Sequence, residues 1–247
     1  MKYLKEFSTE NDYLTYRNDK NKYLKPNVSL CDDNGSVYYN FTPPPNSNGH
    51  DYVDLGLPSG TLWATMNVGA SKASDAGLYF QWGDTQGYTK DQVGRGNGQK
   101  KFTWGDYKWS INGSASNFRK YTTKGATLEL EDDAAHVNMG GDWHMPTPDQ
   151  IEELIDNTTT AWTTQDGVNG KLFTSNKDTS KSIFIPAAGA AEDGSLYYSR
   201  SYGYVWSSML SAGFITDGQI LSFGSGDAYL GNGRNRYSGF SVRGVIG

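Results

Sequence analysis

The hydrophobic positions of this chain follow two different spacings. In the run MPTPDQIEELIDN, apolar residues recur at helical spacing, so that Ile151, Leu154 and Ile155 share one face. Thr147 stands as the N-cap, a proline takes the first helical position, and Gln150 completes a capping box. From residue 162 onward, short aromatic and β-branched runs alternate with glycine and polar residues, a pattern that predicts strands.

The first 42 residues have a pattern of their own. The run FSTENDYLTYRND predicts a short helix with Ser8 or Thr9 as N-cap, and PNVSLCDDNGSVYYNFTP predicts a hairpin that turns at Asp33-Asn34-Gly35. The run PPPNSNG suits neither a helix nor a central strand, so residues 43–50 are predicted to be a linker. A helix-plus-hairpin module of this size is too small to be stable alone, and we expect it to dock on a partner or on the main domain.

Residues 51–247 are expected to form one α+β domain. Strands at both ends enclose two central helices, the first of which ends at Gly140, and the terminal strands are expected to pair. The aromatic run GLYFQWGDT is expected to be a further strand. Residues 86–125 are expected to be an ordered loop because three large aromatic side chains can hold it in place: Trp104, Tyr107 and Trp109.

Composition narrows the classes of function. The 247 residues include 7 Trp, 17 Tyr and 30 Gly, which indicates a turn-rich fold with an aromatic core. A net charge of −5 argues against nucleic acid or an anionic membrane surface as a partner. We find no apolar run of roughly 18 residues and no signal-peptide pattern, so membrane insertion and an export signal are not expected. Cys31 is the single cysteine, which excludes an internal disulfide.

Patterns for catalysis or metal binding are weak. Three histidines lack metal-ligand spacing and are interpreted as ordinary surface or core residues: His50, His136 and His144. An acidic run is interpreted as helix N-terminal acids rather than a calcium site: Glu129, Glu131, Asp132 and Asp133. No GxSxG occurs, Cys31 is predicted to be buried and inert, and GSGDAYLGNG lacks the Gly-Lys-Ser/Thr of a phosphate loop. We therefore expect a binding or structural protein with no catalytic residue, cofactor or metal, and not an enzyme.

The C-terminal segment, residues 204–238, is the candidate binding surface. Ser222 and Gly224 flank the apolar Phe223, so strand alternation is expected to turn both toward solvent. Tyrosine and arginine anchor recognition surfaces, and serine and glycine adapt around them. A plain solvent loop is the alternative interpretation. Trp206 is expected to pack beneath the candidate ligand-binding residues, which are Ser222, Gly224, Asp227, Tyr229, Gly231, Asn232, Gly233, Arg234, Tyr237 and Ser238.

Several long runs over residues 51–247 resemble a known family. VDLGLPSGTLWATMNVGA, YFQWGDT, LELEDDAAHVNMGGDWHMPTPDQIEELID, WTTQDGVNGKLFT, SIFIPAAG, SYGYVWSS and NRYSGFSVRGV occur in the order seen in the major paralogous domains of gut bacteria and their phages. The resemblance implies a C-type-lectin-like fold of the formylglycine-generating-enzyme branch. The enzymes of that branch carry cysteines in the C-terminal half. Cys31 lies outside the domain, so their activity is not implied.

Some members of this fold are variable proteins of diversity-generating retroelements, such as the phage major tropism determinant. Their relatives carry an asparagine-rich stretch where this chain has SFGSGDAYLGN, which implies adenine-directed variation of the C-terminal segment. The resemblance therefore implies a virion-associated or extracellular receptor-binding protein whose ligand is a bacterial surface protein or glycan. Residues 1–42, which are similar to opening modules of phage tail proteins, would attach to a virion tail or assembly partner.

Three readings thus stand side by side: a diversified binding protein, a carbohydrate-binding or cell-surface module of fixed specificity, and a degenerate enzyme of the formylglycine-generating type. A homo-oligomer is compatible with each of them. Variation at the 3′ end of the gene, glycan binding, and copper or calcium binding would distinguish the three.

Overall fold

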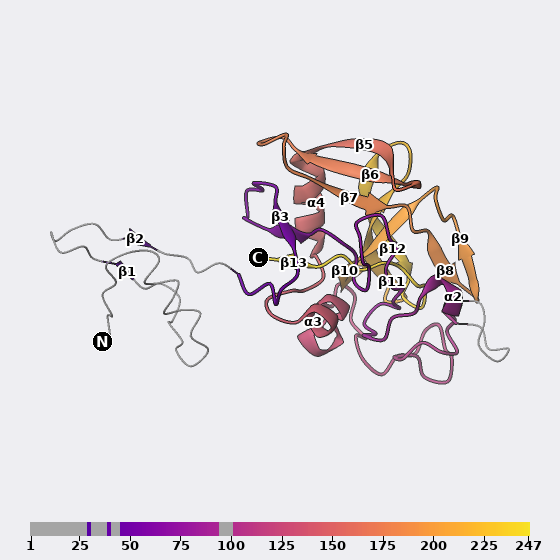
Figure 1. The fold of residues 1–247 in the computed structure, drawn as a ribbon. Coiled ribbons are helices and arrows are strands. Elements are labelled where there is room, and N and C mark those ends of the chain that lie inside the picture. Colours follow the sequence, from indigo (N-terminus) through magenta and orange to yellow (C-terminus); the bar gives the residue numbers. More distant parts are fainter. Residues whose placement is uncertain (1–28, 31–38, 41–44, 94–100) are drawn as a thin grey trace. The chain divides into compact units, whose positions relative to one another are not determined.

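The computed structural model describes residues 29–30, 39–40, 45–93 and 101–247 (Figure 1). The chain divides into two units, Met1–Pro45 and Asn46–Gly247, which are described separately. In the first unit, β1 (Ser29–Leu30) and β2 (Tyr39–Asn40) pair antiparallel, as a hairpin requires. The predicted N-terminal helix, the predicted turn and Cys31 lie outside the described residues.

The second unit is mostly strand with few helices, which agrees with an α+β fold (Figure 1). Among the described residues, no helix has the length and apolar character needed to cross a membrane. Its elements in chain order are β3 (Tyr52–Asp54), β4 (Leu62–Ala64), α2 (Lys90–Val93), the 3-10 helix η1 (Leu130–Asp132), α3 (Ala134–Met139), α4 (Pro148–Asp156), β5 (Thr158–Gln165), β6 (Val168–Ser175), β7 (Ser182–Pro186), β8 (Ala190–Glu192), β9 (Ser195–Tyr197), β10 (Gly203–Leu210), β11 (Asp217–Phe223), β12 (Ala228–Asn235) and β13 (Val245–Ile246).

The strands of residues 46–93 and 101–247 form small antiparallel sheets. Their orders are β10-β11-β12, β13-β4-β3, β5-β6-β7 and β8-β9. The pairing of β13 with β4 confirms that the two ends of this unit meet, as the sequence predicted. The predicted strand in GLYFQWGDT is wrong, because residues there form only isolated bridges such as Phe80 with Phe240.

The sheet β10-β11-β12 lies at the centre of the core, with an apolar cluster on each face. Trp206 pairs with Ile220 across β10 and β11, and both belong to the first cluster. Val205 pairs with Leu221, and both belong to the second, which also contains Phe223. Because side chains alternate along a strand, this sheet is covered on both faces.

Both central helices were predicted. The capping box of α4 is present, with the Thr147 side chain accepting from the Gln150 backbone N–H. Helix α3 ends at Gly140, whose φ of 71° favours glycine. It begins later than the sequence indicated, because Asp133 is its N-cap and accepts hydrogen bonds from the backbone of Ala135 and His136.

The predicted long loop is described at residues 86–93, which include the short helix α2, and at residues 101–125, which aromatic packing holds as predicted. The Trp104 ring lies against Tyr107 and Phe118, with ring centroids 5.8 and 5.6 Å away. The indole Nε1 of Trp109 donates to the Gly83 carbonyl at 2.9 Å. These side-chain contacts hold in place a segment that is mostly turns and bends and forms only isolated β-bridges.

Candidate ligand-binding surface

Two tyrosines and a serine form a row across the central sheet. In the strand register, Tyr204 of β10 lies opposite Ser222 of β11, and Ser222 lies opposite Tyr229 of β12. Residues directly opposite in an antiparallel sheet point to the same face. The two phenol side chains therefore flank the small serine, and Tyr229, on the outer strand, is 57% exposed.

Further tyrosines continue this row beyond the sheet. The rings of Tyr202 and Tyr204 stack at 6.3 Å with an interplanar angle of 9°. The Tyr198 ring meets Tyr202 edge-on at 5.7 Å, and the Tyr197 ring lies 6.3 Å from Tyr198. We call this group, with one cation, the tyrosine surface: Tyr197, Tyr198, Tyr202, Tyr204, Tyr229 and Arg234.

Arg234 gives the tyrosine surface a positive charge. Its guanidinium carbon lies 5.3 Å from the ring centroid of Tyr204, a cation–π contact. Burial raises the pKa of Tyr204; the charge of Arg234 opposes that rise, and the phenols of Tyr229, Tyr198 and Tyr202 add to it. The Tyr204 phenol therefore stays neutral near pH 7. A phenol hydroxyl can both donate and accept hydrogen bonds.

The loop that carries Tyr198 and Tyr202 is held in an uncommon backbone conformation. Tyr198 and Arg200 have φ angles of 57° and 69°, in the left-handed region that side chains disfavour. Backbone hydrogen bonds hold the loop: the Arg200 N–H donates to Ala187 O at 2.7 Å, and the Gly189 N–H donates to Tyr202 O at 2.9 Å. Gly189 is required here, since a Cβ atom would lie 2.2 Å from the Tyr197 carbonyl oxygen. A fixed loop presents its aromatic side chains at a lower entropic cost of binding.

A buried lysine supports the turn between β11 and β12. The Nζ of Lys171, which is 1% exposed, donates to the carbonyl of Gly226 in this turn. Burial lowers the pKa of Lys171, and the nearby carboxylate of Asp227 raises it. The turn that carries Asp227 is thereby tied to the sheet β5-β6-β7 beneath it.

The tyrosine surface offers aromatic faces, phenol hydroxyls and a guanidinium. This chemistry suits recognition, because large amphipathic rings bury much area with few rotatable bonds. Comparisons with protein-family models, with curated proteins and with solved structures find no match to this chain.

The structure brings only part of the predicted site to the surface. Asp227, Tyr229, Asn232 and Arg234 are exposed on the β11–β12 turn and on β12, and Gly231 and Gly233 are half-buried between them. β12 is an outer strand of its sheet, so these positions extend past the core on one side. The alternative interpretation, a plain solvent loop, does not hold for Ala228–Asn235, which form β12.

The predicted exposure of Ser222 and Gly224 is wrong. Ser222 is 2% exposed because it lies between Tyr204 and Tyr229 on a face that the first apolar cluster covers. Gly224 is buried against Tyr202, whose ring carbon Cε1 would lie 3.0 Å from an added Cβ atom. Both positions support the tyrosine surface from below and cannot contact a ligand in this conformation.

Tyr237 and Ser238 also lie apart from the tyrosine surface. The Tyr237 ring packs 4.8 Å from Trp104 of the long loop, and burial raises its pKa. Ser238 is fully buried, and its hydroxyl donates to Glu192 Oε1 at 2.7 Å. Trp206 is a core residue as predicted, but it lies on β10 within the first apolar cluster, on the same face of the sheet as Tyr204.

Three exposed tyrosines of the surface were not among the predicted site residues: Tyr197, Tyr198 and Tyr202. They lie before the segment that the candidate list covers. The sequence nevertheless indicates a recognition loop in the run LYYSRSYGY, where tyrosines are interspersed with serine, arginine and glycine and the apolar residues follow neither strand nor helix spacing. Such a run is typical of recognition loops.

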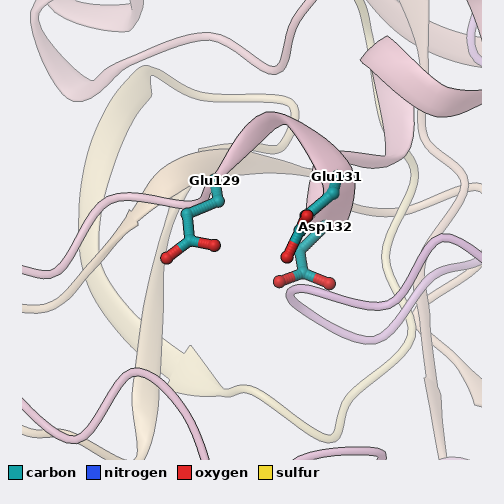
Figure 2. A group of neighbouring side chains, drawn as sticks. All are labelled: Glu129, Glu131 and Asp132. Carbon is teal, nitrogen blue, oxygen red and sulfur yellow. The ribbon is translucent and has the colours of Figure 1, made fainter.

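The acidic run forms an ion-pair network at another place on the unit. Figure 2 shows the side chains of Glu129, Glu131 and Asp132, whose carboxylate oxygens lie within 4.8 Å of one another. The Nζ of Lys120 contacts all three, at 2.6 Å from Glu129, 3.1 Å from Glu131 and 2.7 Å from Asp132. Asp133 caps α3, as the interpretation of the run as helix N-terminal acids requires. The other three lie at the start of the single-turn η1, with Glu129 as its N-cap, and also share a lysine.

The pKa shifts of this network agree with that arrangement. Hydrogen bonds to Asp132 and Glu129 raise the pKa of Lys120. Burial alone would raise the pKa of Asp132, but hydrogen bonds from Lys120, Tyr121 and Lys108 outweigh it and hold the pKa below its ordinary value. The lysine thus supplies the positive charge that three close carboxylates need.

The histidines lie apart and contact backbone or aromatic groups. Nδ1 of His136 bonds to the Trp143 carbonyl at 3.0 Å, and Nε2 of His144 bonds to the Gly247 carbonyl at 3.1 Å. His50 meets the Trp143 ring edge-on. The described geometry fits the interpretation of all three as ordinary surface or core residues.

Proposed function

We propose that this chain is a non-enzymatic protein that binds a ligand or receptor through the tyrosine surface. The observation that carries the proposal is the gathering of exposed aromatic side chains. Among the described residues, eight large hydrophobic side chains are exposed, and four of them belong to this one surface: Tyr197, Tyr198, Tyr202 and Tyr229. Contiguous exposed apolar area beside an arginine is typical of binding sites.

The proposed fold is C-type-lectin-like, and the proposed class is a variable protein of a diversity-generating retroelement. The location of the exposed residues supports this. Asp227, Tyr229, Asn232 and Arg234 lie on an outer strand and its turn, where substitutions leave both apolar clusters intact. The ligand is a bacterial surface protein or glycan, and residues 1–42 attach the chain to a virion tail or a similar display assembly.

Sequencing the 3′ end of this gene across one natural population tests the diversification. We expect variation at adenine-derived codons of Asp227, Tyr229 and Arg234, while the codons of Trp206 and Arg243 stay fixed. Ser222 and Gly224 are expected to vary less than the exposed positions because both are buried. A uniform 3′ end would instead favour a carbohydrate-binding or cell-surface module of fixed specificity, in which exposed rings such as Tyr202 and Tyr229 would hold sugar faces.

Removal of single tyrosines tests the surface itself. We expect Tyr202→Ala or Tyr229→Ala to weaken binding of the labelled full chain to intact bacterial cells by roughly 30-fold, since an aromatic hot spot contributes about 2 kcal/mol or more. Titration by flow cytometry measures the change. Tyr52→Ala is the matched control, because Tyr52 is 38% exposed but lies on β3, outside the tyrosine surface.

Equal loss of cell binding in the Tyr52→Ala variant would contradict the assignment of the surface. Unchanged binding in both Tyr202→Ala and Tyr229→Ala would do the same. In the latter case the ligand would contact another part of the chain, and glycan arrays with the wild-type chain would be the next measurement.

A further inference from the structure

Strand β5 presents an open edge of a kind that folded proteins usually protect. It forms the outer strand of the sheet β5-β6-β7 (Figure 1). All eight of its residues, TTTAWTTQ, pair with β6 without a register shift. Within residues 45–93 and 101–247, its backbone has partners only on the β6 side. Alternate N–H and C=O groups along its other side are therefore free to pair with a further strand.

The sequence of β5 carries none of the features that block edge pairing. Charged side chains, proline and bulges are the usual protection, and β5 has none of them. Five of its eight residues are threonine and one is tryptophan, residue types that favour strands. Most of the strand is exposed, and Thr160 and Trp162 are half-buried on the face toward the second apolar cluster.

Other long edges of this unit are covered or charged. The Nη2 of Arg243 donates to the Phe184 carbonyl on β7. On β10, the N–H groups of Trp206 and Ser208 donate to the carbonyls of Ser241 and Pro146. β12 carries the charged Arg234, and its pairing with β11 shifts register. The contrast singles out β5 as the edge available to a partner strand.

We propose that β5 pairs antiparallel with β5 of a second copy of this chain. In an antiparallel pair, two opposite residues either both hydrogen-bond to the neighbouring strand or both point their backbone groups away from it. When two identical strands pair by a two-fold axis, opposite residues must therefore be an even number of positions apart, and the axis passes through one residue. Centred on Ala161, the pairing places Thr159 opposite Thr163 of the second copy and Thr160 opposite Trp162. Threonine pairs and pairs of aromatic with β-branched residues stabilise neighbouring strands. The paired segment carries no charge, so the self-pairing meets no repulsion.

Sedimentation velocity of the full chain over a concentration series tests the proposal. The wild type is expected to sediment as a dimer at the upper end of the series. Thr159→Lys combined with Thr163→Lys places lysines opposite lysines, and we expect loss of the dimer. Thr159→Lys combined with Thr163→Glu places each lysine opposite a glutamate, and we expect the dimer to be retained. Both positions are exposed, so the two double variants should keep the wild-type circular dichroism and melting temperature.

A wild-type chain that stays monomeric throughout the series would overturn the proposal. So would a dimer that the double lysine variant leaves undiminished, because the contact would then lie elsewhere. The matched glutamate variant separates loss of pairing from a general effect of charge on this strand.

Discussion

Replacement of Trp206 by alanine is expected to lower the free energy of unfolding by about 3–5 kcal/mol, the usual cost of truncating a large core aromatic residue. The indole is fully buried in the first apolar cluster, and its ring lies 4.5 Å from that of Phe240. Its Nε1 donates to the Phe80 carbonyl at 2.7 Å. The variant would leave a cavity, and the Phe80 carbonyl would keep only the hydrogen bond from the Phe240 N–H. Chemical denaturation followed by fluorescence and circular dichroism measures the loss.

Tyr229→Ala is the control for Trp206→Ala, because it also truncates an aromatic residue of the same sheet. Tyr229 is exposed, so we expect a change in the free energy of unfolding within about 0.5 kcal/mol. Should Tyr229→Ala destabilise the fold as much as Trp206→Ala, Tyr229 would be a core residue. The tyrosine surface would then lose its outermost anchor, and the proposed function would lose its main support.

Local patterns were enough to predict elements whose signals lie within a few residues. The capping box of α4 uses side chains three positions apart, and the glycine end of α3 depends on one backbone angle. The strand predicted for GLYFQWGDT was wrong because aromatic residues also occur in irregular segments of the core. Trp82 is buried, and its Nε1 donates a hydrogen bond to the Ser207 carbonyl, which lies far away in the sequence. Periodicity cannot detect such a partner.

The candidate site was predicted in part for a related reason. Strand alternation tells which residues share a face, and it placed Ser222 correctly on the face opposite Phe223. Whether that face meets solvent depends on what packs over it, and here Tyr204 and Tyr229 enclose Ser222. Asp227 lies on the turn before β12 and Arg234 on β12, an outer strand, and both are exposed.

Tyr237 and Ser238 show the limit of proximity in sequence. Directly after β12 the chain turns inward, and Arg236 is fully buried with its guanidinium 3.5 Å from the Phe118 ring centroid. The two residues that follow therefore contact the long loop and Glu192 instead of the tyrosine surface. In contrast, Tyr198 and Tyr202 lie on the loop before β10. The pairing of β10 with β11, and of β11 with β12, brings that loop close to Tyr229.

Arg243, in the C-terminal run GFSVRGV, joins its own segment to the segment of Ala64 and Asn67 and to β7. It is fully buried, and it donates from Nε to Asn67 Oδ1 at 2.9 Å, from Nη1 to Ala64 O at 2.9 Å and from Nη2 to Phe184 O at 3.0 Å. Within the described residues it forms no ion pair with a carboxylate. Burial lowers the pKa of Arg243 to about 9, so the group remains charged at pH 7.

Arg243→Lys is expected to cost about 3 kcal/mol or more in the free energy of unfolding at pH 7. A lysine keeps the buried charge, but a single ammonium group cannot reach three acceptors that a planar guanidinium joins. Each buried acceptor left without a partner costs about 1–3 kcal/mol. The conservative replacement of one cation by another is therefore expected to be strongly destabilising. Chemical denaturation at pH 7 measures the difference.

The pH dependence of the Arg243→Lys variant distinguishes a buried cation from a simple loss of packing. Burial would lower the pKa of the new lysine below its unfolded value of about 10.4, so the unfolded state would bind more protons between the two values. The free energy of unfolding of the variant should then rise with pH from 7 toward 10. The wild type should not show this rise between pH 7 and 8, because Arg243 stays protonated in both states there. A variant with wild-type stability and a wild-type pH profile would mean that the three carbonyl contacts do not hold the C-terminal strands in place.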